Sequence, residues 1–294
     1  MSLATYKLFC TIAEQKNMAQ SAELLHITPS AATHAMNSLE KTLGFTLLNR
    51  DRRGVTLTAY GEMLLPRFRA ILQEEENLQE EISQINGLEK GCVRIGVFDS
   101  VCTSWLPTIL GSFKKKYPRI EVQVYQGGYQ DIEDKLKFAL LDMGFVSLPT
   151  SDQFNTITLL HDRLLCVAPQ DYFPKTPPYV TPNDLRQVPL IIAKRGYDRN
   201  ISDFFEQNQL FCSQQHNIAS ESSAIAMVEA GMGCSIFPEL ALKIHPGNYK
   251  VFPLINNEYR TIALATLKEK RPSLAGSKMI QEIRSILETY STLS

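Results

Sequence analysis

The sequence lacks the features that would place it in or across a membrane. It has no stretch of about 18 consecutive apolar residues, which is roughly the length that a spanning helix needs. Residues 1–15 also lack a basic start followed by an apolar run, the pattern of a secretion signal. We therefore expect a cytoplasmic protein that has no membrane segment.

Cysteine and histidine are few and widely spaced. The six cysteines include no Cys-x-x-Cys pair, and neither they nor the five histidines cluster at the spacing of zinc ligands. We therefore expect no metal site and no cofactor, and thiols that stay reduced and mostly buried. A redox-sensing cysteine is the alternative, although no close pair of cysteines supports it.

Motifs of common enzymes are missing as well. The sequence contains no Gly-x-Ser-x-Gly nucleophile turn, no Gly-x-x-x-x-Gly-Lys phosphate loop and no His-Glu-x-x-His metalloprotease motif. The absence of all three favours a protein that binds other molecules and does not transform them. We therefore expect that the chain is not an enzyme.

The composition is that of a folded chain with little net charge. The 294 residues are 44% hydrophobic and 21% charged, which suits a proper core, and the length suits two or three domains. A formal net charge of -1 excludes a uniformly basic surface. Any surface that binds nucleic acid must therefore be a local one.

The first 58 residues carry the signals of three short helices. Apolar residues at helical spacing near the start of the chain predict the first helix. Asn17 is placed to cap the second helix. Thr28, followed by Pro29 at the first helical position, is placed to cap the third. Gly44 is a typical stop signal, and we expect the third helix to end near residue 42.

The predicted third helix has two opposite faces. An apolar stripe must pack on the other helices and consists of Ala32, Ala35, Met36, Leu39 and Leu43. A stripe of short hydrogen-bonding side chains lies opposite and consists of Ser30, Thr33, His34, Asn37 and Lys41. The major groove of DNA admits one helix, and side chains of this type read base edges there. An ordinary solvated helix face is the alternative interpretation.

A basic turn follows the third helix. Residues 45–48 and 55–57 have the pattern of two short strands, and the turn between them carries Arg50, Arg52 and Arg53. A helix-turn-helix followed by a β-hairpin is a winged helix, in which the hairpin meets the DNA backbone. Arginine suits this place because its planar guanidinium grips phosphate oxygens in pairs.

These segments together resemble the LysR-type transcriptional regulators. The resemblance rests on residues 9–14 (FCTIAE), 21–31 (SAELLHITPSA) and 54–62 (GVTLTAYGE), and on Leu39-Glu40, Leu43-Gly44 and Asn49-Arg50. It implies a DNA-binding domain whose contacts are Thr28, Pro29, Ser30, Ala31, Thr33, His34, Asn37, Arg50, Arg52 and Arg53. Thr33 and His34 stand where the family often has serine and arginine, so the family's base preference is not carried over.

A long helix is predicted after this domain. Thr58 can cap it, Pro66 lies inside it, and Gly87 is a stop signal after its expected end near residue 86. Apolar residues repeat by threes and fours on one side, as in a short coiled coil, at Phe68, Ile71, Leu78, Ile82 and Ile85. The acidic opposite face favours pairing with a second chain, and the family resemblance also implies dimers. Packing on the rest of its own chain is the alternative.

From residue 90 onward, strands alternate with helices. This alternation predicts α/β units with a largely parallel sheet. A second unit begins near residue 164, and a strand over residues 259–267 and a final helix return to the first. The predicted fold is therefore a multidomain one: a winged helix-turn-helix (1–58), a linker helix (59–89) and a two-lobed α/β domain (90–294). Lobe I is expected to span about 91–163 and 266–294, and lobe II about 164–265.

Residues 98–100 (FDS) with Leu106-Pro107, Phe113 with Tyr117-Pro118, and residues 228–238 resemble the effector domain of the same family. That domain is similar to type II periplasmic binding proteins. The resemblance implies a ligand between the lobes, where strand ends and helix N-termini meet. The expected effector contacts are Ser100, Val101, Cys102, Thr103, Val146, Ser147, Lys194, Arg195 and Gly196. The alternative role for residues 100–103 is helix capping. The alternative for Arg195 is an ordinary charged side chain on the surface. If Arg195 faces the ligand, a carboxylate effector follows.

The sequence thus predicts a transcription regulator that binds double-stranded DNA and responds to a small-molecule effector. Its partners are expected to be DNA, an effector of unknown identity and further copies of itself, as a homodimer or tetramer. A small-solute-binding protein without DNA function is the alternative, because the last two thirds have that architecture. Residues 1–58 distinguish the two interpretations, because a solute-binding transport protein does not need a DNA-binding domain.

Overall fold

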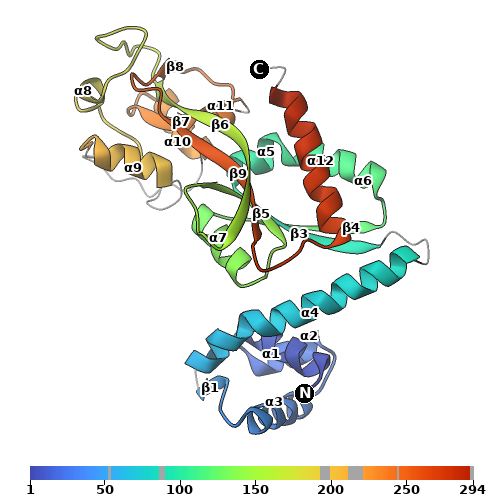
Figure 1. Ribbon diagram of the computed structural model, residues 1–294. Helices are drawn as coiled ribbons and strands as arrows, with labels where there is room; N and C mark the ends of the chain where they lie inside the picture. Colours follow the sequence, from blue (N-terminus) through green and yellow to red (C-terminus); the bar gives the residue numbers. More distant parts are fainter. Residues whose placement is uncertain (52–53, 86–89, 193–198, 211–220, 244, 292–294) are drawn as a thin grey trace.

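The computed structural model describes residues 1–51, 54–85, 90–192, 199–210, 221–243 and 245–291. Figure 1 shows a small helical domain at the N-terminus, a long helix beside it, and a larger α/β region on the other side of that helix. Within the described ranges, no helix is both long enough and apolar enough to cross a membrane.

The helices of the N-terminal domain follow their sequence signals. The elements of this domain are α1 (Leu3–Gln15), α2 (Met18–Leu24), α3 (Pro29–Leu43), β1 (Leu48–Asp51) and β2 (Gly54–Leu57). The Asn17 side chain accepts backbone hydrogen bonds at the start of α2, and the Thr28 hydroxyl does so for α3. Gly44 ends α3 with a φ of 83°, a left-handed conformation that glycine adopts readily. The predicted caps are therefore confirmed.

The first strand of the hairpin begins at Leu48 and not at residue 45 as predicted. The Glu40 carboxylate accepts hydrogen bonds from the backbone N–H groups of Leu47 and Leu48, at 2.7 and 3.1 Å. A side chain of α3 therefore holds this backbone where the strand begins. In the β1–β2 ladder Arg50 lies opposite Val55. Arg50 is thus a strand residue, not a turn residue as the sequence predicted.

The long helix α4 (Ala59–Ile85) connects the two parts of the molecule. The Thr58 hydroxyl accepts a hydrogen bond from the Gly61 N–H at 3.1 Å, which confirms Thr58 as its cap. Pro66 lies inside the helix, as expected. The predicted end near residue 86 lies outside the described residues. α4 contacts α1 of the N-terminal domain and α12 of the C-terminal region (Figure 1).

The C-terminal region consists of two lobes. Lobe I contains β3 (Gly91–Val97), α5 (Asp99–Ser104), α6 (Leu106–Lys116), β4 (Ile120–Gln126), α7 (Tyr129–Lys137), β5 (Met143–Leu148) and α12 (Leu274–Ser291). Lobe II contains α8 (Pro182–Leu185), α9 (Arg199–Gln207), α10 (Glu221–Glu229), β7 (Ser235–Pro238), α11 (Glu239–Leu242) and β8 (Lys250–Pro253). The chain leaves lobe I along β6 (Phe154–Ala168) and returns along β9 (Tyr259–Leu267).

The sheet is mixed, not largely parallel as predicted. Its strand order is β4-β3-β5-β9-β6-β7, with β8 beside β6. β3 pairs in parallel with β4 and β5, whereas β9 runs antiparallel to both of its neighbours, β5 and β6. The reason is that β6 carries the chain out of lobe I and β9 brings it back beside it. β6 also pairs antiparallel with β7 and β8 in lobe II.

The parallel strands of lobe I place two helices at one edge of the sheet. α5 begins directly after β3, and α7 begins shortly after the neighbouring strand β4. Their first turns therefore lie at the carboxyl ends of adjacent parallel strands, where α/β proteins build ligand sites. Buried apolar side chains of β3, β5, α6 and α12 hold this edge in place.

Candidate functional sites

The polar stripe of α3 lies on the surface, and its apolar stripe is buried. Ser30, His34 and Asn37 are exposed, while Ala32 and Met36 on the other side have no exposed surface. Among the other predicted contact residues, Thr28, Pro29 and Ala31 are exposed. Thr33 is half-buried, and its hydroxyl donates to the Pro29 carbonyl at 2.9 Å. The helix thus presents a continuous polar face beginning at its N-terminus.

The hairpin places one arginine beside this helix. Arg50 Nη2 lies 3.3 Å from Glu40 Oε2, and the Arg50 side chain is 34% exposed. The ion pair joins β1 to the C-terminal half of α3, while the guanidinium remains open to solvent. Glu40 was not among the predicted site residues. Arg52 and Arg53 lie outside the described residues.

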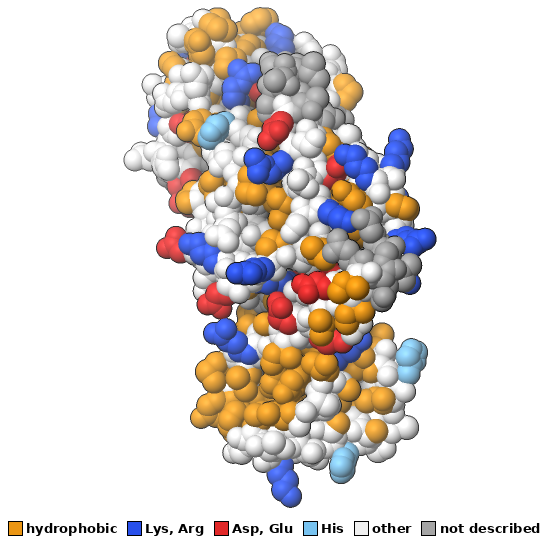
Figure 2. Space-filling view, turned by 45° about the vertical axis from the view of Figure 1, so that its right-hand side comes forward, with side chains coloured by type: hydrophobic (Ala, Val, Ile, Leu, Met, Phe, Trp, Pro, Cys, Tyr) orange, Lys and Arg blue, Asp and Glu red, His pale blue; other side chains and the backbone are white. Residues whose placement is uncertain are grey.

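The solvent side of α4 carries a row of large apolar side chains. Ile71, Leu78, Ile82 and Ile85 are 43%, 53%, 41% and 85% exposed. Figure 2 shows hydrophobic side chains gathered over the lower part of the molecule, where Figure 1 places α1 to α4. The row is larger than predicted, because two further exposed side chains of the same helix are Tyr60 and Met63.

Phe68 does not belong to this row, contrary to the sequence prediction. Its side chain is 6% exposed. It stacks on Tyr6, with 4.5 Å between ring centroids, and meets Phe9 edge-on at 5.4 Å. Burial in the core of its own N-terminal domain keeps Phe68 from a second chain. The spacing of apolar residues could not show which of them are buried within the chain and which are exposed to a second chain, because both faces of α4 carry apolar residues.

The predicted effector turn at the start of α5 is divided between interior and surface. Ser100 and Val101 have no exposed surface. Cys102 is half-buried, and its thiol lies 3.6 Å from Gln126 Oε1. Thr103 is exposed and donates to the Asp99 carbonyl at 2.9 Å. Ser100 does not cap α5, because the N-cap position is Phe98 and no side chain caps this helix. The Ser100 hydroxyl accepts a hydrogen bond from Arg260 at 2.7 Å.

Arg260 stands at the centre of a buried polar cluster that sequence reasoning missed. It is 1% exposed, and its guanidinium donates to Ser100, to the Tyr129 hydroxyl at 2.6 Å and to Asp162 at 2.9 Å. Asp162 in turn accepts from the Leu240 N–H at 2.9 Å. Burial raises the pKa of Asp162, while the Arg260 charge acts in the opposite direction.

This Arg260 cluster connects the turns of lobe I with the point where the lobes join. Its members come from β9, α5, α7, β6 and α11, which are far apart in the sequence. Removing one partner of a buried charged pair is strongly destabilising, because it leaves the other charge buried alone. We infer that this cluster holds α5 and α7 in place relative to lobe II.

Of the remaining predicted effector residues, Val146 and Ser147 are described, and both lie on β5. Val146 and Ser147 are fully buried, and Ser147 exchanges hydrogen bonds of 2.9 and 3.0 Å with Asn200 of α9. Beside it, Arg199 Nη2 donates to Glu133 Oε1 of α7 at 3.0 Å. Lys194, Arg195 and Gly196 lie outside the described residues. Sequence reasoning did not find Glu133, Arg199 or Asn200.

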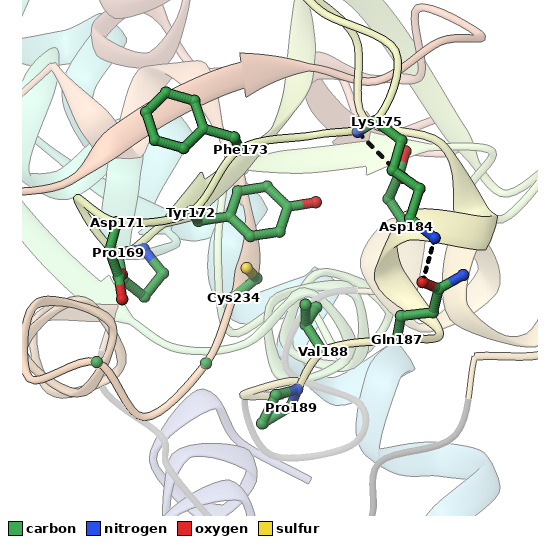
Figure 3. Close-up of a pocket in the computed structure, with 12 residues that line it drawn as sticks. Pro169, Asp171, Tyr172, Phe173, Lys175, Asp184, Gln187, Val188, Pro189 and Cys234 are labelled. Atoms are coloured by element: carbon green, nitrogen blue, oxygen red, sulfur yellow. Dashed lines mark hydrogen bonds between the residues drawn. The ribbon is translucent and has the colours of Figure 1, made fainter.

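A separate cavity of about 440 Å³ opens within lobe II (Figure 3). The rings of Tyr172 and Phe173 and the side chains of Lys175 and Asp184 line it, and none of the predicted effector residues that the structure describes does. The Tyr172 hydroxyl is buried and has no hydrogen-bond partner among the described residues, and its pKa is raised by burial. Cys234 also lines this cavity, and Figure 3 shows it between Tyr172 and Val188.

The cysteines within the described ranges are all free thiols. Cys10, Cys166 and Cys234 are buried, and burial raises the pKa of Cys10 to about 11. A hydrogen bond with Cys234, together with burial, raises the pKa of Cys166. The thiols of Cys10 and Cys166 are therefore protonated and weak nucleophiles at neutral pH. Over the same ranges, no group of three or more histidine, cysteine or acidic side chains is placed to hold a metal ion.

Family models match both parts of the chain. Residues 3–62 match the bacterial regulatory helix-turn-helix protein, lysR family, and residues 86–288 match the LysR substrate binding domain. The chain is 27% identical over 289 residues to the HTH-type transcriptional regulator YvbU of Bacillus subtilis, covering 97% of this chain and 99% of that protein. It is 26% identical over 264 residues to the transcriptional activator IlvY of Haemophilus influenzae, covering 85% and 88%.

Solved structures share the fold over nearly the whole chain. A full-length OxyR variant from Pseudomonas aeruginosa superposes with a TM-score of 0.73 at 20% identity, covering 98% of this chain and 97% of that one. CbnR, solved in complex with its target DNA, superposes with a TM-score of 0.55 at 22% identity, covering 98% and 100%. The arrangement of the N-terminal domain, linker helix and two lobes is therefore that of full-length regulators.

The chain belongs to the LysR family of bacterial transcriptional regulators. It combines the DNA-binding helix-turn-helix domain of that family with the LysR substrate-binding domain. The predicted family, fold class and regulatory function are confirmed, and the family consists of transcription regulators and not of enzymes. The match over residues 3–62 rules out the alternative of a solute-binding protein without DNA function.

Proposed function

We propose that α3 reads base edges in the major groove of double-stranded DNA. The observation that carries this proposal is the exposed polar stripe, which includes Ser30, His34 and Asn37, on a helix whose apolar back is buried. Residues 29–37 contain no carboxylate, so nothing on this face repels phosphate. The other contacts that we propose from the sequence are Thr28, Pro29, Ala31 and Thr33.

The hairpin supplies phosphate contacts in this proposal. Arg50 is fixed next to α3 by Glu40, which orders its side chain before DNA arrives. Arg52 and Arg53 follow in the sequence and add two further cations. Contacts to phosphate orient the domain on the duplex, whereas α3 provides the sequence preference.

Two copies of the chain assemble through α4. The exposed row of Ile71, Leu78, Ile82 and Ile85 is apolar, and a second copy of the same row would bury it. A dimer presents two reading helices to two half-sites of one duplex. Two such dimers form the tetramer in this proposal.

A small-molecule effector binds between the lobes, near Ser147 and the start of α5. Its binding shifts the relative orientation of the lobes, and α4 passes this change to the N-terminal domains. Such a shift requires that the effector bind the two orientations with different affinities. The regulator acts on DNA in the cytoplasm. The proposed units are residues 1–58, 59–89 and 90–294.

DNA binding is tested by fluorescence anisotropy of the full-length protein with duplexes selected from a random pool, across a series of salt concentrations. We expect salt-sensitive binding, and Arg52→Ala should flatten the dependence of log K on log salt by about one ion. An unchanged slope would remove Arg52 from the phosphate contacts. Failure to bind any duplex at low salt would refute the proposed function.

A further inference from the structure

Two neighbouring residues at the start of α9 join lobe II to lobe I. Arg199 pairs with Glu133 at 3.0 Å, and Asn200 exchanges hydrogen bonds with Ser147. The Glu133 side chain is 5% exposed, whereas that of Arg199 is 41% exposed. Water can therefore solvate the arginine if the pair opens, but it cannot solvate the carboxylate to the same degree.

Glu133 depends on Arg199 for its positive partner. Over the described residues, Arg199 supplies both the hydrogen bond and the ion pair that Glu133 receives. A buried carboxylate that loses its cation is strongly unfavourable. Any molecule that separates Arg199 from Glu133 must therefore bring a positive charge to Glu133.

The second arginine near this lobe contact cannot bind a ligand directly. Arg260 is 1% exposed, and Asp162 already neutralises it. In the described part of the lobe contact, a carboxylate ligand is thus left with Arg199. A ligand that carries only a carboxylate would pair with Arg199 and leave Glu133 without a cation. The two carboxylates would then repel each other. The sequence prediction of a carboxylate effector depends on Arg195, which lies outside the described residues; at the Arg199–Glu133 pair, a carboxylate alone is disfavoured.

We propose that the effector carries an ammonium and a carboxylate together, as an α-amino acid does. The ammonium pairs with Glu133, the carboxylate pairs with Arg199, and Ser147 and Asn200 provide hydrogen bonds to its polar atoms. One ion pair between the lobes becomes two, and neither charge is left unpaired. This inference rests on the proposed function, namely that a small molecule binds between the lobes.

Insertion of such a molecule also explains how it would act on the lobes. It lengthens the connection between α7 and α9 by the width of the ligand, so the relative position of the lobes must change. A neutral molecule leaves the Arg199–Glu133 pair closed. An acid without the amino group meets an unpaired Glu133, which weakens its binding on the order of 30-fold or more.

The test is a thermal-shift titration of the full-length protein with the twenty protein amino acids. Each amino acid that raises the Tm is compared with the acid that lacks its amino group and with the amine that lacks its carboxylate. We expect at least one amino acid to raise the Tm. The concentration that it needs for a given increase should be about tenfold or more below the concentration that either analogue needs. Stabilisation by none of the twenty, or equal stabilisation by the deaminated acid, would overturn the proposal.

Two variants test the pairing itself. Glu133→Gln removes the negative charge at nearly constant shape, so the amino acid should lose its advantage over the deaminated acid. Arg199→Gln changes an exposed side chain, so it provides a second test if Glu133→Gln does not fold. In this variant the amino acid should no longer raise the Tm at lower concentrations than the amine does. Retention of the wild-type preference in either folded variant would contradict the proposal.

Glu282→Gln is the matched control. Glu282 has a 6% exposed side chain, pairs with Lys116 at 2.6 Å, and lies on α12 away from the lobe contact. This variant should lower the Tm but keep the amino-acid preference. Salt-sensitive duplex binding is measured on the same preparations. If DNA binds and no amino acid stabilises the protein, the effector class is wrong and the DNA-binding function stands.

Discussion

Arg69 of α4 donates a hydrogen bond to the Glu14 carboxylate of α1, with 3.0 Å between Nη2 and Oε1. The same guanidinium donates from Nη1 to the carbonyl of Phe138, directly after α7, also at 3.0 Å. Arg69 is 8% exposed. One buried side chain therefore joins the DNA-binding domain, the linker helix and lobe I. Because α7 also carries Glu133, a short helix connects the contact between the lobes with the linker.

Substitution of Arg69 should destabilise the arrangement of the domains. Arg69→Gln removes the donor to Phe138 and the cation beside Glu14, and a lost buried hydrogen bond costs about 1–3 kcal/mol. We expect a lower Tm in thermal unfolding of the full chain. Arg67→Gln is the control, because its pair with Glu269 is 71% and 75% exposed and should contribute less than about 1 kcal/mol. Equal losses in the two variants would contradict the role of Arg69.

The polar face of α3 should determine sequence preference. His34→Ala and Thr33→Ala should each weaken binding to a selected duplex by about 1–3 kcal/mol and relax the preference for it over random DNA. Thr42→Ala, at the other end of the same helix, is the control and should leave the preference unchanged. Anisotropy titrations with both duplexes measure the difference. Parallel losses on selected and random DNA would show that these side chains contact the backbone only.

The apolar row of α4 should hold two chains together. Ile82→Asp places a charge in this row, and we expect monomers in light scattering, because a buried unpaired carboxylate is costly in an apolar interface. Val124→Asp is a matched control, since Val124 is 42% exposed and Ile82 41% exposed, and Val124 lies on β4. That variant should remain dimeric. Dimers in both variants would place the interface elsewhere.

The Glu282–Lys116 pair should make stability depend on pH. Burial acts to raise the pKa of Glu282, but hydrogen bonds from Lys116 and Ser112 and the Lys116 charge lower it below 4.5 overall. The folded protein therefore binds this proton more weakly than the unfolded chain does. The stabilisation is present above pH 4.5 and is lost as the pH falls through the folded-state pKa.

Unfolding of wild type and Glu282→Gln across pH values measures this effect. We expect the wild type to be more stable near neutral pH, with a difference that shrinks as the pH falls from 4.5. The neutral amide does not titrate, so only the wild type contributes the change. A difference that stays constant down to about pH 3 would show that the pair contributes no pH-dependent stability.

Local signals predicted the N-terminal domain well because its helices are short and capped by their own neighbours. Asn17, Thr28 and Gly44 act within a few residues of the backbone groups that they satisfy. The predicted hairpin was displaced because Glu40, on the preceding helix α3, holds the backbone at Leu47 and Leu48. Interactions between elements, even inside one small domain, were beyond the reach of periodicity.

The same limit applies to Phe68 and to the lobes. Phe68 has the spacing of the exposed row, but Tyr6 and Phe9 of α1 bury it. The parallel sheet was predicted from alternating strands and helices, and β9 then entered between β5 and β6 in the opposite direction. Neither the burial of Phe68 nor the position of β9 has a signal in the neighbouring residues. Each depends on which segment, distant in the sequence, packs against it.

By itself, the sequence determined the family, the order of the domains, the caps of the first helices and the polar face of α3. These features follow from backbone hydrogen bonds and side-chain periodicity over a few residues. Only the tertiary structure decided that Arg260 meets Asp162, that Arg69 meets Glu14 and that Arg199 meets Glu133. Each pair joins residues that are 55 or more positions apart along the chain. Folding buries at least one charge of each pair, and that charge needs an opposite charge beside it because burial without a partner is strongly unfavourable. Which residue becomes the partner depends on how whole elements pack.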